Sequence, residues 1–67
     1  MNIYKVMSNV AMIELYKMNA YGIWDLITAD EDEYREFRAN HKLTKISSQD
    51  WPNDELETET IIFTEIL

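Results

Sequence analysis

The chain has 67 residues, of which thirteen are acidic and six are basic, so its formal net charge is −7 at pH 7. A domain this small leaves little room for both a core and an enclosed reaction centre, and its negative charge repels nucleic acid and anionic membranes. Because 46% of the residues are hydrophobic and none is cysteine, we expect one folded domain without disulfides, stabilised by apolar burial or self-association.

Two segments in the first half of the chain predict β-strands. Residues 3–7 and 21–28 are rich in the β-branched and aromatic side chains that suit a pleated sheet. The segment between them, residues 10–18, fits either one face of a helix or the alternation of a strand. We favour a strand, which predicts a three-stranded meander.

Short polar pairs separate these three segments. Ser8-Asn9 and Asn19-Ala20 are typical of turns between antiparallel strands. The alternative is that Ser8 or Asn9 caps the start of a helix.

A helix is predicted to begin near Asp30 and to end at residues 40–42. The β-prone run of residues 26–29 passes directly into four consecutive acidic residues. Carboxylates in the first turn of a helix are stabilised by unpaired N–H groups and by the positive end of the helix dipole. A strand should therefore end near Ala29, just before the helix.

The predicted helix is amphipathic. Tyr34, Phe37 and His41 fall at i, i+3 and i+7 and share one face. Glu31 and Arg35 are spaced for an ion pair on another face. We expect Tyr34 and Phe37 to pack the helix across the sheet.

The last third of the chain predicts a loop and then a strand. Residues 47–54 have the composition of a turn, with one short helical turn at residues 52–56 as an option. Residues 58–66 have the β-branched density of a strand, and apolar side chains on both of its faces indicate that neither face is fully solvated. The predicted fold class is α+β, with an antiparallel sheet of three to four strands and one helix packed across it.

No residue pattern indicates catalysis, a cofactor or a metal ion. The acidic run that begins at Asp30 lacks the alternate ligand spacing and the glycine turn of a calcium loop, so we interpret it as a helix start. His41, the sole histidine, is interpreted as a helix-end residue rather than a general base. The basic residues of the helix region are interleaved with acids, which favours intramolecular pairing over direct binding of nucleic acid.

The acidic C-terminal third is the candidate partner-binding site, because every charged residue from Asp50 onward is acidic. Three interpretations are open: a solubilising face, an irregular interface with a basic protein, and a DNA mimic in which carboxylates stand in for phosphates. Trp24 is expected to be buried, whereas Trp51 could cap the core or anchor a partner. The candidate partner-binding residues are Asp50, Trp51, Asp54, Glu55, Glu57 and Glu59.

The order of the segments resembles a group of small phage-encoded β-α-β proteins. Residues 3–6, residues 26–33 and the lone Trp51 before a closing strand carry this resemblance. It implies that the strand-to-helix junction and the tryptophan are architectural, and that the protein is an accessory factor that inhibits a host enzyme or defence system. The resemblance implies no catalytic residues.

From these observations we expect a cytoplasmic, non-enzymatic protein that inhibits or modulates a host nucleic-acid-handling or defence protein. The amino terminus lacks the pattern of a secretory signal, and no apolar run approaches the roughly 20 residues that span a bilayer. The alternative is a structural protein that forms a homo-oligomer, for instance a homodimer, through residues 61–66. If that strand lay at a sheet edge, no proline or lysine would protect it from pairing.

Overall fold

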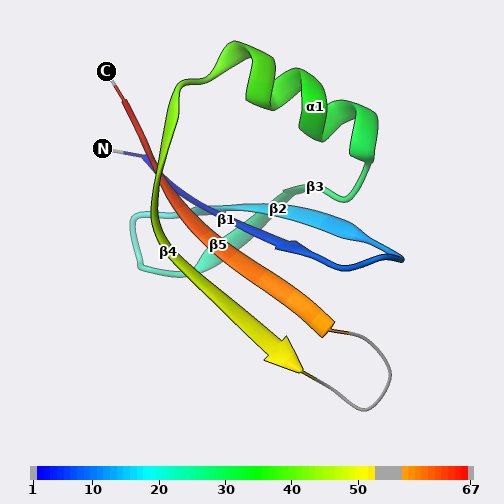
Figure 1. Cartoon of the computed structure of the whole chain (residues 1–67). Helices are drawn as coiled ribbons and strands as arrows, with labels where there is room; N and C mark the ends of the chain where they lie inside the picture. Colours follow the sequence, from blue (N-terminus) through cyan, green and yellow to red (C-terminus); the bar gives the residue numbers. More distant parts are fainter. Residues whose placement is uncertain (1, 53–56, 67) are drawn as a thin grey trace.

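The computed structural model describes residues 2–52 and 57–66, and residues 50–52 and 57 are described by their backbone alone. Within these residues the chain forms a five-stranded antiparallel sheet with one helix across one face (Figure 1). The elements in chain order are β1 (Ile3–Ser8), β2 (Ile13–Met18), β3 (Trp24–Thr28), α1 (Glu31–Asn40), β4 (Leu43–Pro52) and β5 (Glu57–Glu65). The predicted α+β class is confirmed, but the sheet has five strands rather than three to four.

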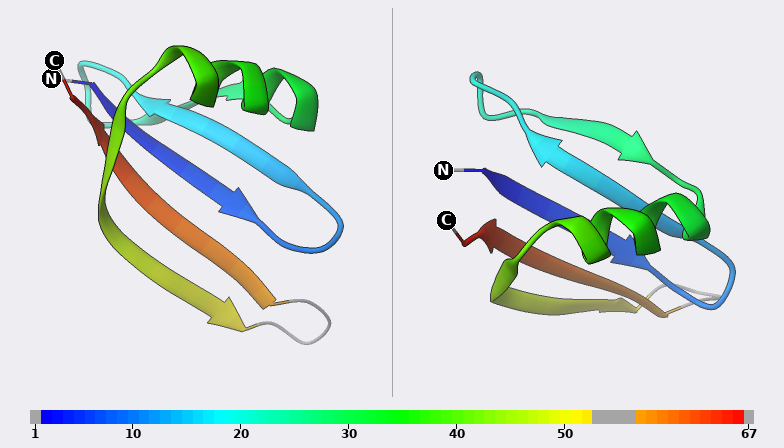
Figure 2. Two further views of the ribbon diagram at one scale, coloured as in Figure 1. Left: turned by 45° about the horizontal axis from the view of Figure 1, so that its top comes forward. Right: turned by 90° about the horizontal axis from the view of Figure 1, so that it is seen from above.

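The strand order in the sheet is β3-β2-β1-β5-β4, and every neighbouring pair is antiparallel. The first three strands form the predicted meander. Helix α1 then carries the chain over one face, from the edge strand β3 to the opposite edge strand β4, and β5 returns between β4 and β1 (Figure 2). The two ends of the described chain lie side by side, where the Glu65 N–H donates to the Asn2 carbonyl at 3.0 Å.

Two asparagines shape the turns of the meander. The Asn9 side-chain oxygen accepts hydrogen bonds from the backbone N–H groups of Ala11 and Met12, at 2.8 and 3.0 Å. Asn19 does the same for Tyr21 at 2.9 Å, and Gly22 supplies the positive φ of 77° that this turn needs. Residues 13–18 are therefore a strand, as favoured. The predicted strand bounds are wrong for residues 10–12 and 21–23, which lie in the turns.

Helix α1 begins and ends where the sequence predicts. The Asp30 carboxylate caps it by accepting the Glu33 backbone N–H at 2.9 Å, and the helix ends at Asn40. Glu31 and Arg35 form the predicted i,i+4 ion pair at 2.7 Å on the exposed face. In the described part of the chain, no helix is long and apolar enough to cross a membrane.

The core lies between α1 and the centre of the sheet. Its buried side chains are Tyr4, Val6, Leu15 and Phe63, from β1, β2 and β5. The register places Val6 opposite Leu15, and Tyr4 opposite Phe63, so these side chains lie on one face of the sheet. Tyr34 and Phe37 of α1 pack against this cluster, which confirms the predicted contact of the helix with the sheet.

The predicted loop at residues 47–54 is wrong for residues 47–52, because β4 continues to Pro52. Serine, glutamine and aspartate have low strand propensity, but β5 offers a long partner with which this segment pairs along its length. Pro52 has no backbone N–H to donate. It is tolerated at the end of the edge strand β4, because an edge strand has a neighbouring strand on one side only. The sequence also offered a short helical turn at residues 52–56. Its first residue, Pro52, is in β4, and residues 53–56 lie outside the described residues.

The expectation that residues 61–66 could form an exposed sheet edge is also wrong. Strand β5 pairs with β1 on one side and with β4 on the other, so its backbone groups are used within the sheet. The edges are β3 and β4. The interior position of β5 explains why it carries apolar side chains on both faces: Phe63 lies toward α1, and Ile62 lies on the opposite face and is half-buried.

Candidate functional site

The predicted acidic site falls at the end of the β4–β5 hairpin. The end of β4 and the start of β5 lie away from α1 (Figure 1). The backbone register places Asp50 opposite Glu59, Trp51 opposite Thr58 and Pro52 opposite Glu57. The fold therefore brings together four of the six candidate residues, while Asp54 and Glu55 lie outside the described residues.

The register leaves this hairpin end with concentrated negative charge. Asp50 and Glu59 occupy directly opposite positions, and like charges at such positions destabilise a sheet. The Glu59 side chain is exposed and forms no ion pair with any lysine or arginine of the described part. Opposed acidic positions of which Glu59 is open to solvent suit the binding of a cationic surface.

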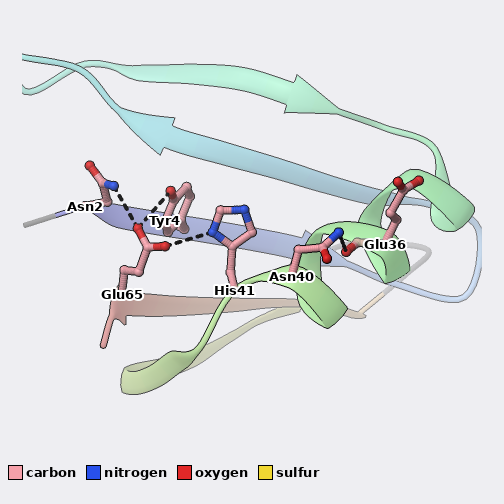
Figure 3. Close-up of polar contacts among 6 residues, drawn as sticks. All are labelled: Asn2, Tyr4, Glu36, Asn40, His41 and Glu65. Carbon is pink, nitrogen blue, oxygen red and sulfur yellow. Dashed lines mark hydrogen bonds and ion pairs between the residues drawn. The ribbon is translucent and has the colours of Figure 1, made fainter. Parts of the chain in front are cut away.

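A second polar cluster, which the sequence did not predict, centres on Glu65 at the end of β5 (Figure 3). One carboxylate oxygen is 2.8 Å from Nδ1 of His41, just after α1. The other accepts a hydrogen bond from the Asn2 amide at 2.7 Å and a longer one from the Tyr4 hydroxyl at 3.5 Å. The carboxylate therefore links the end of the helix to both ends of the described chain.

The electrostatics of this cluster favour a structural link over proton transfer. Hydrogen bonds from Asn2 and then His41 lower the pKa of Glu65 below its ordinary value of 4.5. Burial, and then the neighbouring Glu65 charge, raise the pKa of Tyr4 above 10.0. At neutral pH the carboxylate is thus held ionised and the phenol protonated, which is the state that the hydrogen bonds require.

We expect Glu65→Gln to remove a pH-dependent part of the stability. A carboxyl group with a lowered pKa in the folded state stabilises the protein above the ordinary pKa, and this contribution is lost as the pH falls through the lowered value. The difference in unfolding free energy between wild type and Glu65→Gln should therefore be largest near pH 7 and shrink progressively below about pH 4.5. Urea unfolding followed by circular dichroism at several pH values measures this difference.

Glu36→Gln serves as the control for this measurement, because Glu36 is an exposed glutamate on α1. Its difference from wild type should stay small at every pH. A Glu65→Gln difference that does not change between neutral and acidic pH would contradict the role assigned to the cluster.

A third feature is a cation held between two aromatic rings on the sheet face opposite α1. The Lys5 ammonium lies 4.7 Å from the ring centroid of Tyr16 and 4.9 Å from that of Trp24. Trp24 is therefore only half-buried, on the uncovered face, and its predicted burial in the core is wrong. Two sequence signals point to a second apolar face: apolar residues on both faces of β1, and apolar residues on both faces of the predicted strand at residues 58–66.

The arginines of α1 make intramolecular contacts, as the sequence predicts. Arg35 pairs with Glu31, whereas Arg38 donates to the Tyr34 hydroxyl at 2.9 Å and lies 4.6 Å from the Phe63 ring centroid. Arg38 thus covers one side of the core rather than offering a free charge. In the described residues, no three His, Cys, Asp or Glu side chains are placed to hold a metal ion.

Comparisons with known proteins give no match for the chain. No family model, no curated protein and no solved structure matches it. The candidate functional features of the described structure are therefore the acidic hairpin, the Glu65 cluster and the uncovered sheet face.

Proposed function

We propose that the protein is a small non-enzymatic binding protein that docks its acidic β4–β5 hairpin on a basic protein surface. The observation that carries this proposal is the register that sets Asp50 opposite Glu59, together with the exposure of Glu59. Facing acidic residues are unfavourable in the free protein. Lysine or arginine side chains of a partner would relieve that repulsion, and this relief would make binding more favourable.

The partner we propose is a host protein that handles nucleic acid or acts in defence. Residues two apart on a strand lie on the same side at a spacing of about 7 Å, so a strand with alternate acids presents a regular row of negative charge. Glu57 and Glu59 have this spacing on β5. Such a row suits a groove built for phosphates, and occupying that groove would make the protein an inhibitor of the kind that phages encode.

Charge reversal of the hairpin tests the proposal. The wild-type chain is immobilised, proteins from a candidate host extract are captured at low and at high salt, and the salt-sensitive protein is purified. Its affinity is then measured for wild type and for the double variant Glu57→Lys/Glu59→Lys. We expect the dissociation constant to rise by about tenfold or more, and the affinity of wild type to fall with increasing salt.

The matched control is Glu33→Lys/Glu36→Lys, which changes the net charge by the same amount on exposed positions of α1. If the partner binds at the hairpin and does not respond to net charge alone, this control should bind nearly as well as wild type. A duplex DNA competitor should displace the protein if the captured surface is a nucleic-acid groove. Unchanged binding by the hairpin variant would contradict the proposal.

A further inference from the structure

The sheet face opposite α1 is the open face, because no described element covers it (Figure 2). Much of this face is nevertheless apolar. The register puts Lys5 of β1 between Tyr16 of β2 and Ile62 of β5, with Leu26 and Ser47 completing the row across all five strands. Among the described side chains, those that supply the apolar surface of this face are Ile3, Met7, Tyr16, Met18, Trp24, Leu26 and Ile62.

This composition departs from the usual pattern of an antiparallel sheet with one covered face. The solvated face of such a sheet normally carries polar side chains at alternate positions. Here that pattern holds on β4, whose side chains Ser47 and Gln49 are polar and exposed, and in part on β5, where Thr60 and Thr64 flank Ile62. On β1, β2 and β3, together with Ile62 of β5, the open face is an apolar patch, and Leu26 within it is 55% exposed. Contiguous apolar patches on small proteins mark interfaces.

The charges of the open face differ from those of the rest of the molecule. In the part of this face whose side chains are described, the charged residues are Lys5 and Glu14, one of each sign. The many acids lie instead on α1 and near the end of the β4–β5 hairpin. The open face is therefore a neutral surface on a chain with net charge −7, where two copies can meet with little repulsion.

Lys5 and Glu14 are also arranged for pairing between two copies. Lys5 lies opposite Tyr16 and Met7 lies opposite Glu14, so the two charged residues are diagonal neighbours on the open face. Lys5 is half-buried, fixed between two rings, and forms no ion pair with a described carboxylate. A two-fold axis that runs between Lys5 and Glu14 in the interface would bring each Lys5 to the partner's Glu14.

We propose that the open face is a homodimer interface, in which a second copy of this chain packs sheet against sheet. The dimensions suit this arrangement. Five strands spaced by about 4.8 Å are about 24 Å wide, and strands of five to ten residues are about 17–33 Å long. The face can thus contribute several hundred Å², which approaches the roughly 800 Å² that each partner buries in a standard interface.

The fold disfavours the other route to a dimer, which is pairing of sheet edges. Strand β4 carries Lys45 and Pro52, and its pairing with β5 is interrupted by a bulge between Lys45 and Ser47. Strand β3 also has a bulge where it pairs with β2, between Leu15 and Tyr16 of β2. Lysine, proline and bulges are the features by which edge strands avoid pairing. Packing of the open faces does not require the backbone N–H and C=O groups of the edge strands.

Sedimentation equilibrium over a wide concentration range tests the proposal, with two matched variants of the whole chain. Leu26→Glu places a charge in the open face, whereas Ile46→Glu places one at a position of β4 with nearly equal exposure, 55% against 56%. We expect wild type and Ile46→Glu to dimerise, and the dissociation constant of Leu26→Glu to rise about a hundredfold or more because a charge would be buried unpaired. Circular dichroism verifies that both variants fold.

A charge exchange provides an independent second test. Glu14→Lys should weaken the dimer by opposing two lysines, and Lys5→Glu/Glu14→Lys should restore dimerisation because the signs are again complementary. A wild type that stays monomeric at all concentrations would overturn the proposal, and so would a dimer that survives Leu26→Glu, which would point to edge pairing. A monomer whose Leu26→Glu variant loses a captured partner would assign the open face to that partner instead.

Discussion

Leu15→Ala is expected to lower the free energy of unfolding by about 2–5 kcal/mol, because it leaves a cavity at a fully buried position. Leu15 is the one large side chain with no exposed surface in the described structure, and it lies opposite Val6 and Thr28 at the centre of the sheet. The core is a single layer between α1 and the sheet, so few neighbours can move to fill the space. A loss of this size is a large part of the roughly 5–15 kcal/mol that stabilises a typical domain.

Urea unfolding followed by circular dichroism measures this effect. Ile46→Ala is the control, since Ile46 is a large aliphatic residue that is 56% exposed at the bulge of β4. It should change the free energy of unfolding by only about 0.5 kcal/mol. Equal effects of the two substitutions would show that the side-chain cluster around Leu15 is not the main source of stability.

Phe37→Ala is expected to release α1 from the sheet at a cost of about 3 kcal/mol. The Phe37 ring stacks on His41 with centroids 4.1 Å apart, and meets the Tyr4 ring edge-on at 4.9 Å. These contacts join the helix to β1 and to the Glu65 cluster. Because no residue of α1 is itself fully buried, the helix depends on few such contacts to remain in place.

Amide hydrogen exchange distinguishes local release of the helix from global unfolding. In Phe37→Ala the amides of α1 should exchange much faster than in wild type, while those of β1 and β5 keep most of their protection. Phe37→Leu is the matched variant, because it retains apolar volume and should preserve most of the helix protection. Helix protection that is unchanged in Phe37→Ala would contradict the anchoring role.

The two proposals concern separate parts of the molecule. The acidic hairpin lies at one end of β4 and β5, whereas the apolar patch of the open face lies mainly on β1, β2 and β3. A dimer built on the open face would carry two hairpins, and a partner with two basic sites could then bind both and gain avidity. Either proposal can fail without the other, because the hairpin variant tests binding and the Leu26→Glu variant tests dimerisation.

The local features of this fold follow from the sequence. Asp30 and the acids after it fix the start of α1, because a helix start offers unpaired N–H groups to carboxylates within three residues. Asn9 and Asn19 fix the turns of the meander in the same way, through hydrogen bonds to neighbouring backbone groups. The grouping of acids in the last third also follows directly from the sequence.

The pairing of distant segments was decided only by the tertiary structure. Residues 47–52 form a strand because β5 pairs with them, Glu65 meets His41 because the sheet register brings β5 to the end of α1, and Trp24 lies on the open face beside Lys5. Strand stability depends on what lies across the sheet and on which face is covered, so propensity alone could not locate these residues. Contacts within a few residues are encoded locally, whereas register and burial arise from the whole chain.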